Sequence, residues 1–242
     1  MSEPDLGPDY PQIVPLRGLE CRFEPMNWTF ADENTEAIAT HWARFIAEKP
    51  ASFNGKVLIQ HHWEVVDGVY RGRYLETDYA AFIAWRDFGH PGPPMRNGFA
   101  MAALQARDGA YLLGEMGAGT ANAGKIFFAA GTPDRSDLTP DGRVDLAGSV
   151  LRELGEETGL RPEEVEVSGD WCSVLHGVRA AFMRPVRIDL PAEEARRLIL
   201  ARLPDLGEEE LCDIHIARGP SDIDPARMPP FQAAYLAAMF RG

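Results

Sequence analysis

The chain has 242 residues, and its 37 acidic residues outnumber its 24 basic residues, which gives a formal net charge of −13. This charge excludes non-specific binding to a nucleic-acid backbone, which needs a basic surface, and binding to an anionic membrane surface. Hydrophobic residues make up 45% of the chain, so we expect one large or two small globular domains with a buried core. A phosphate-containing substrate would need local positive charge from a metal ion or from arginines.

The cysteines and the first residues indicate the compartment. Cys21, Cys172 and Cys212 are odd in number and far apart, so neither a disulfide framework nor a zinc cluster is expected. We interpret all six histidines as core or surface residues. The first 15 residues are acidic and proline-rich, so we expect no secretory signal, and no apolar stretch approaches the roughly 20 residues that span a bilayer. These features predict a cytoplasmic protein that binds no membrane.

The first part of the chain is predicted to be a smaller α+β accessory domain over residues 1–94. The run GHPGPP at 89–94 is the strongest break in the pattern, and we place the boundary there. The expected elements, in chain order, are short strands within 11–30, a helix from 32 or 34 to 48, strands over 57–59, 63–66 and 69–75, and a helix over 78–88. Asp67-Gly68 is typical of a hairpin turn between the last two strands.

The remaining residues, 95–242, are predicted to form a second domain. Its expected elements are strands over 98–106, 110–115 and 125–129, a loop over 131–143, a helix over 145–159, strands over 165–174 and 178–188, a helix over 191–203, a strand over 210–217, and a helix over 229–240. Gly159 is expected to end its helix in the left-handed conformation. This order predicts an α/β (α+β) fold, with a mixed β-sheet between helices.

The segment RELGEETGL at 152–160 carries the clearest chemical signal. On a helix, Glu153, Glu156 and Glu157 lie on one face. Three like charges at this spacing repel one another, and a hard divalent cation such as Mg²⁺ relieves the repulsion. Arg152 stands four residues before Glu156 and can pair with it. The alternative interpretation is a solvated acidic helix face.

This segment resembles the second half of the Nudix box, the signature of Nudix hydrolases, whose pattern reads R-E-U-x-E-E-x-G-U with U an aliphatic residue. Every specified position from Arg152 to Leu160 matches. The first half departs from the pattern, because Val144 stands where the box has a glutamate and Asp145 comes one residue later. Gly131, after the predicted strand, is expected as the counterpart of the box glycine, followed by a longer loop.

The resemblance implies a mixed sheet between helices and hydrolysis of the pyrophosphate bond in a nucleoside diphosphate linked to another moiety. It implies a catalytic group of Arg152, Glu153, Glu156 and Glu157, in which the three glutamates bind Mg²⁺ or Mn²⁺ and the arginine orients them. Asp145 is expected as a further metal ligand. The general base is left open. The candidates are Glu208, Glu209 and Glu210, and the alternative interpretation of these three residues is a solvated run of charges.

A second, weaker resemblance suggests the substrate. The segments FNG at 53–55 and TDYxxF at 77–82 are similar to the branch of Nudix proteins that cleaves UDP-sugars. We therefore expect a nucleotide sugar, with the accessory domain shaping the pocket. ADP-ribose, dinucleoside polyphosphates and coenzyme A stay open as substrates, and a catalytically weak ligand-binding sensor is the alternative that Val144 suggests. By analogy with the family, a homodimer is possible.

Four residues are candidates for substrate binding. Arg86 and Arg96 flank the predicted domain boundary, where ligand pockets are frequent, and an arginine can bind a phosphate through two hydrogen bonds. For each of them an ordinary surface arginine is the alternative. Lys125 begins the strand that leads to Gly131, which borders the expected phosphate site.

Overall fold

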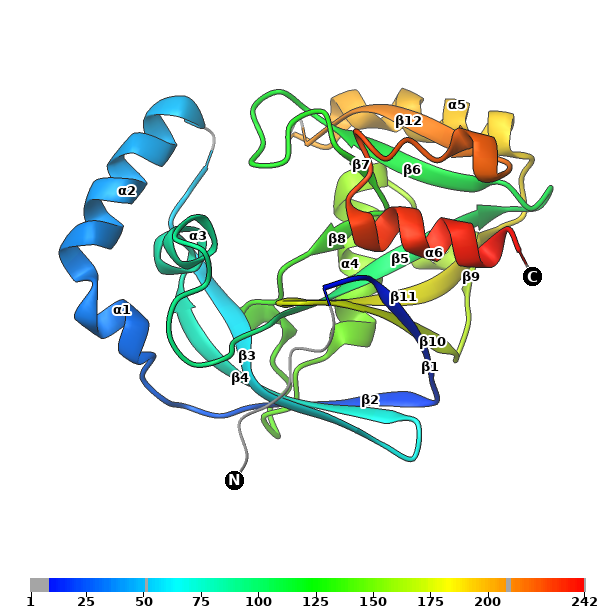
Figure 1. Cartoon of the computed structure of the whole chain (residues 1–242). Helices are drawn as coiled ribbons and strands as arrows, with labels where there is room; N and C mark the ends of the chain where they lie inside the picture. Colours follow the sequence, from blue (N-terminus) through cyan, green and yellow to red (C-terminus); the bar gives the residue numbers. More distant parts are fainter. Residues whose placement is uncertain (1–8, 51, 208–209, 242) are drawn as a thin grey trace.

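The computed structural model describes residues 9–50, 52–207 and 210–241 (Figure 1). The helices are α1 (Thr29–Glu33), α2 (Thr35–Glu48), α3 (Tyr79–Asp87), α4 (Leu146–Thr158), α5 (Ala192–Arg202) and α6 (Pro230–Met239). The strands are β1 (Gln12–Leu16), β2 (Gly18–Phe23), β3 (Lys56–Val66), β4 (Val69–Asp78), β5 (Asn97–Ala106), β6 (Tyr111–Met116), β7 (Ile126–Phe127), β8 (Ala130–Gly131), β9 (Val165–Val167), β10 (Trp171–His176), β11 (Arg179–Ile188) and β12 (Leu211–Ala217).

A nine-stranded sheet forms the centre of the larger part. Its main order is β1-β10-β11-β5-β6-β12, with β7 beside β6, β8 beside β5 and β9 beside β11. β11 and β5 run parallel over ten register pairs, whereas the neighbouring pairs β10–β11 and β6–β12 are antiparallel. The predicted mixed sheet is therefore confirmed.

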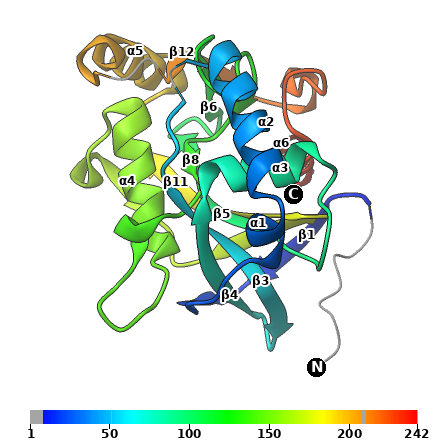
Figure 2. The ribbon, with the colours of Figure 1, turned by 90° about the vertical axis from the view of Figure 1, so that its left-hand side faces the viewer.

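Helices cover both faces of this sheet. Successive residues of a strand point to opposite faces, so one strand packs against helices on both sides. Ala100 and Ala102 of β5 pack in one buried cluster with Leu154 of α4. Phe99 and Met101 pack in a separate cluster with α6. Figure 2 shows α4 and α6 on opposite sides of the sheet. The two clusters confirm the predicted fold class, a mixed sheet between helices.

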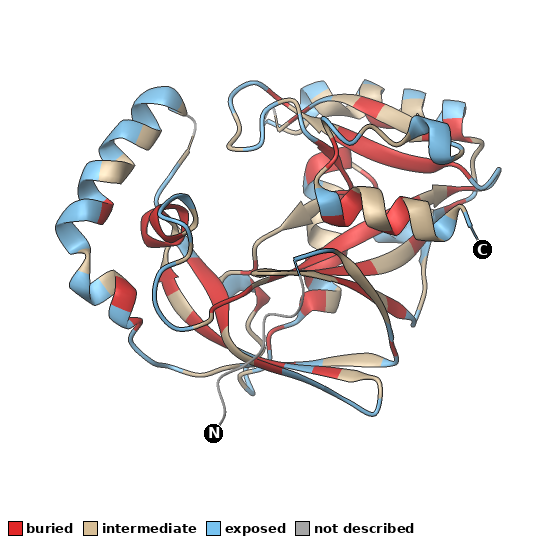
Figure 3. Ribbon diagram, viewed as in Figure 1, coloured by how far each residue is buried: buried red, intermediate tan, exposed pale blue. Residues whose placement is uncertain are grey.

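A three-stranded sheet of order β2-β4-β3 lies next to the large sheet. Its hairpin turn is the one that the sequence predicts, since Asp67 and Gly68 have φ angles of 51° and 73°. Residues of α1, α2, α3, β3 and β4 share a buried cluster, and α2 keeps an exposed outer face (Figure 3). The chain first contributes β1 to the large sheet, so the N-terminal residues take part in both sheets.

The boundaries of several elements differ from those predicted. The strand expected over 165–174 is divided into β9 and β10. Between them the chain turns, and Oγ of Ser168 accepts a hydrogen bond from the backbone N–H of Asp170. The strands expected over 57–59 and 63–66 are one continuous strand, β3. β7 is shorter than expected, since only Ile126 and Phe127 pair with β6. No helix within the described ranges is both long enough and apolar enough to cross a bilayer.

Candidate active site

The RELGEETGL segment lies on α4, as predicted. Asp145 caps the helix, since its Oδ1 accepts a hydrogen bond from the backbone N–H of Gly148 at 3.0 Å. The helix ends at Gly159, whose φ of 69° is left-handed and is therefore well suited to glycine. Val150 and Leu154 are buried against the large sheet. This packing fixes the rotation of α4 and so determines where its glutamates point.

Arg152 is the centre of a group of carboxylates. Its Nη1 lies 2.9 Å from Oε1 of Glu153 and 2.9 Å from Oε2 of Glu156. Its Nη2 donates to both carboxylate oxygens of Asp137, at 3.0 and 3.1 Å. One guanidinium therefore holds three acidic side chains in fixed positions, two from α4 and one from the loop before it.

Strand β8 contacts the remaining glutamate and packs tightly on the group. The backbone N–H of Ala130 donates to Oε1 of Glu157 at 2.8 Å. A Cβ atom on Gly131 would overlap with the carboxylate of Glu153. A side chain at 131 would therefore displace the Glu153 carboxylate from its place against β8, and this is the place expected for the box glycine.

The carboxylates of this group are held in an environment that resists their ionisation. Burial raises the pKa of Glu153 to about 7, although the neighbouring Arg152 opposes the shift. Burial also raises the pKa of Glu157 well above its usual range, and its hydrogen bond from Ala130 only partly counteracts this. Glu210 adds negative charge that raises both pKa values further.

A divalent cation fits this set of donors. Carboxylate oxygens are the ligands that Mg²⁺ and Mn²⁺ prefer, and here one arginine faces more than one buried or half-buried carboxylate. Glu153, Glu156 and Glu157 carry such oxygens on α4, and the charge of Glu210, from a separate segment, acts on two of them. Glu210 immediately precedes β12, and the other two general-base candidates, Glu208 and Glu209, lie outside the described residues.

Asp137 is a site residue that the sequence analysis did not select. It lies in the 3₁₀ turn Arg135–Asp137, within the loop predicted over 131–143, and only 5% of the residue is exposed. Asp134 and Asp137 form a reciprocal cap of this turn. The spacing D-x-x-D could have predicted such a turn. It could not have predicted that the second aspartate reaches Arg152.

The structure does not bring Asp145 to the glutamates. Its carboxylate caps the first turn of α4, and Glu153 follows eight residues later, about 12 Å along a helix that rises 1.5 Å per residue. Val144 is buried and apolar, so the position of the box glutamate has no carboxylate. Asp137, from the loop before α4, contacts Arg152 together with Glu153 and Glu156.

A pocket of about 420 Å³ lies beside β8. It is lined by three of the residues proposed for substrate binding, Arg86, Lys125 and Gly131. Arg96 does not line it: this side chain is buried, and its Cζ lies 4.2 Å from the ring centroid of Trp63.

Both parts of the chain form the walls of this pocket. Its aromatic lining consists of Tyr79, Phe82, Trp85, Phe99, Phe127 and Phe231. The first three residues come from α3 and the others from the larger part of the chain. Ligand sites are often mostly apolar pockets with a few polar groups, and Ala130 and Gly131 of β8 border both this pocket and the glutamates.

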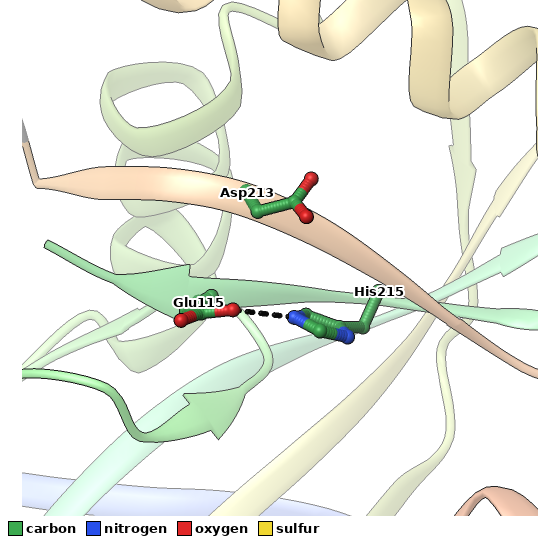
Figure 4. A group of neighbouring side chains, drawn as sticks. All are labelled: Glu115, Asp213 and His215. Carbon is green, nitrogen blue, oxygen red and sulfur yellow. Dashed lines mark hydrogen bonds and ion pairs between the residues drawn. The ribbon is translucent and has the colours of Figure 1, made fainter.

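A second group of potential metal ligands lies where β6 pairs with β12. Ligand atoms of Glu115, Asp213 and His215 lie within 4.8 Å of one another. Nε2 of His215 faces Oε2 of Glu115 at 2.6 Å (Figure 4). Each carboxylate also has an arginine partner, Arg227 for Glu115 and Arg196 for Asp213. The sequence analysis did not select this group; the i, i+2 spacing of Asp213 and His215 on a strand is the signal that could have indicated it.

No protein-family model matches the sequence, and no curated protein matches it. Several solved structures are similar. A Nudix hydrolase from M. smegmatis, RenU, is 16% identical over 60% of this chain and 83% of its own, with a TM-score of 0.38. An Ap4A hydrolase from C. elegans is 12% identical over 59% of this chain and 92% of its own, with a TM-score of 0.39. A MutT protein from Methanosarcina mazei Go1 is 15% identical over 60% of this chain and 94% of its own, with a TM-score of 0.35.

Proposed function

We propose that this protein is a Nudix-type hydrolase that uses Mg²⁺ or Mn²⁺ to cleave the pyrophosphate bond of a nucleoside diphosphate derivative. The observation that carries the proposal is the convergence of Glu153, Glu156 and Glu157 around Arg152 and β8. The sequence RELGEETGL has the spacing of the second half of the Nudix box, and contacts to Arg152 and β8 support the grouping of these side chains.

The residues of the chain have separate tasks in this proposal. A divalent metal ion, when bound, would neutralise the pyrophosphate and stabilise charge on its oxygens. Asp137 fixes the guanidinium of Arg152, which in turn orients Glu153 and Glu156. Glu210 is the general base in this proposal, because its carboxylate acts on the pKa of Glu153 and of Glu157 and so lies within electrostatic reach of both.

A nucleotide sugar is the substrate that we propose. The two segments that resemble the UDP-sugar branch lie side by side: Oδ1 of Asn54 accepts the N–H of Ala80 at 2.8 Å, and the N–H of Tyr79 donates to Gly55 at 2.8 Å. Together they fix the start of α3, and Tyr79 lines the pocket. In this proposal residues 1–94 shape the substrate pocket, while a separate domain, a cytoplasmic location and a homodimer stay predictions.

The test is product analysis with UDP-sugars, ADP-ribose, a dinucleoside polyphosphate and coenzyme A, each with Mg²⁺ or Mn²⁺. We expect UMP and a sugar 1-phosphate from UDP-sugars, and no turnover in Glu156→Gln or Glu157→Gln. Glu163→Gln is the matched control, since this exposed carboxylate pairs only with Arg161 among the ion pairs of the described residues. Its turnover should equal that of the unaltered protein.

Two outcomes would contradict parts of this proposal separately. Cleavage of ADP-ribose without any UMP from UDP-sugars would contradict the substrate and leave the hydrolase in place. Tight binding of these compounds without turnover, unaffected by Glu156→Gln and Glu157→Gln, would contradict the hydrolase and support a ligand-binding sensor.

A further inference from the structure

The pocket beside β8 has a polar end that the proposed hydrolysis does not use. Four polar side chains line it: Arg86 in the last turn of α3, His90 just after this helix, Asn97 at the start of β5, and Arg179 at the start of β11. Asn97 and Arg179 are direct register partners on neighbouring parallel strands. Segments from both parts of the chain therefore meet at this end.

Two of these side chains have unsatisfied polar atoms. Nε2 of His90 and Oδ1 of Asn97 are buried, and neither has a hydrogen-bond partner among the described residues. Buried polar atoms almost always have a partner in proteins. The amide of Asn97 can present its oxygen or, after rotation, its NH₂ group to a ligand. Both atoms are closed off from the pocket in this arrangement, and a turn of either side chain would present its unpartnered atom to a polar ligand.

Positive charge at this end is only partly neutralised. Arg86 pairs with Asp87 at 2.7 Å, but no ion pair within the described residues joins Arg179 to a carboxylate. Burial and the charge of Arg86 both lower the pKa of Arg179. Burial, Arg179 and Arg86 likewise lower the pKa of His90, against the raising effect of Asp87. A half-buried cation without a counter-ion is unfavourable, and an anionic ligand would remove this cost.

The polar end is separated from the glutamates along β5. Gly131 of β8 pairs with Ala100, which follows Asn97 by three residues, or about 10 Å of extended strand. Asn97, Phe99 and Met101 point to the same face of β5, and all three line the pocket. This separation of backbone positions exceeds the length of a pyrophosphate, whose two phosphorus atoms share one oxygen. An anion here belongs to another part of the substrate.

We propose that Arg86, His90, Asn97 and Arg179 bind a second anionic group of the substrate, a carboxylate or a phosphate carried by a moiety remote from the cleaved pyrophosphate. This inference rests on the proposed function and narrows its substrate class. The aromatic side chains between the two ends contact the uncharged part of the same molecule.

The experiment measures binding by calorimetry without divalent metal, so that it does not depend on turnover. Two pairs of probes differ by one anionic group each: UDP-glucuronate against UDP-glucose for a carboxylate, and NADP⁺ against NAD⁺ for a phosphate. We expect the charged member of at least one pair to bind about tenfold or more tightly, and Arg179→Gln or Arg86→Gln to abolish this preference. The pair that shows it identifies the anionic group.

Arg187→Gln is the matched control, because Arg187 lies on the same strand but is exposed and outside the pocket. A change in folding is detected separately: Arg179→Gln should unfold at the same or a higher temperature than the unaltered protein in the absence of ligand, because it removes a half-buried charge. Inorganic phosphate should raise the unfolding temperature of the unaltered protein and of Arg187→Gln, but not that of Arg179→Gln.

The proposal is overturned if the charged and neutral members of both pairs bind equally, or if Arg179→Gln and Arg187→Gln have the same effect. Hydrolysis could still occur in that case, so the proposed function would stand. Conversely, a charge preference that depends on Arg179, in a protein that hydrolyses none of the compounds, would support the anion site and contradict the proposed function.

Discussion

Arg152 and Asp137 are 15 residues apart in sequence, and the guanidinium of one donates to both carboxylate oxygens of the other. Asp137 is almost completely buried, with 3% of its side chain exposed. A buried carboxylate is normally paired, and Arg152 is its ionic partner here. The long loop before α4 thus supplies a buried carboxylate that binds the arginine of the helix.

We predict that Asp137→Asn lowers turnover or metal affinity by about 10- to 100-fold, the usual effect of losing a group that orients a metal ligand. Asparagine keeps the size of the side chain and can still accept the N–H of Asp134, but it loses the charge that holds Arg152. Phosphate release and titration with Mn²⁺ measure the effect. Asp141→Asn is the control, because this exposed residue of the same loop pairs with Arg143. Equal activity of the two variants would show that α4 alone orients Arg152.

The contact between β8 and Glu153 leads to a second prediction. Gly131→Ala places a methyl group where the Glu153 carboxylate lies, so either β8 or the carboxylate must move. We expect a loss of divalent-metal stabilisation and a decrease in the free energy of unfolding of about 1–3 kcal/mol, typical of overpacking. Thermal unfolding with and without Mn²⁺ measures both. Gly169→Ala, where no atom lies within 4 Å of the added Cβ, should change neither quantity; similar behaviour of the two variants would disprove the steric explanation.

Local signals in the sequence predict the site in part. The apolar stripe of α4 and the stop at Gly159 define the helix, and the spacing of Glu153, Glu156 and Glu157 places three carboxylates on one face. These properties depend on neighbouring residues along the chain, which a sequence displays directly.

The contacts that complete the site depend on the path of the chain between elements. Asp137 reaches Arg152 because a loop folds back over α4, and Arg179 joins the pocket because β11 pairs with β5 in one particular register. Neither the contact of Asp137 nor the register of β11 produces a periodic pattern of residues in the sequence. Arg96 is the opposite case. Its position near the predicted domain boundary suggested contact with a ligand, but its side chain is buried over the ring of Trp63.

The raised pKa of Glu153 predicts how stability depends on pH. Its folded-state pKa of about 7 exceeds the ordinary value of 4.5, so between these pH values the folded protein binds a proton that the unfolded chain releases. The metal-free protein should therefore lose stability as pH rises through this window, by up to about 3 kcal/mol. Metal ions require the ionised carboxylate, so stabilisation by Mn²⁺ should be larger at pH 8 than at pH 5.5.

Thermal unfolding at several pH values, with and without Mn²⁺, measures this dependence. Glu153→Gln should reduce the pH dependence of the metal-free protein and leave the part that the raised pKa of Glu157 contributes, whereas Glu166→Gln, an exposed position on β9, should leave it unchanged. A metal-free protein that gains stability between pH 5 and pH 7 to the same extent in all three forms would contradict the role of Glu153.

The last prediction concerns the junction between the two sheets, which holds α3 and its pocket residues beside the large sheet. The hydroxyl of Tyr74 on β4 donates to the carbonyl of Gly98 on β5 at 3.0 Å and accepts from Nε2 of Gln60 at 2.8 Å. Tyr74 is completely buried, so Tyr74→Phe deprives two buried groups of this partner. We expect a decrease in the free energy of unfolding of about 1–3 kcal/mol. Tyr10→Phe, at an exposed tyrosine, should have no effect.

Urea unfolding followed by two probes shows whether the sheets unfold together. Four of the five tryptophans lie before residue 95, so fluorescence reports mainly on the smaller sheet and its helices, whereas far-ultraviolet circular dichroism also reports on the large sheet. Because Tyr74 bridges the sheets and β1 belongs to the large one, we expect coincident transitions that Tyr74→Phe shifts equally. A shift confined to fluorescence would instead show that the N-terminal residues unfold as a separate domain, as the boundary after residue 94 predicts.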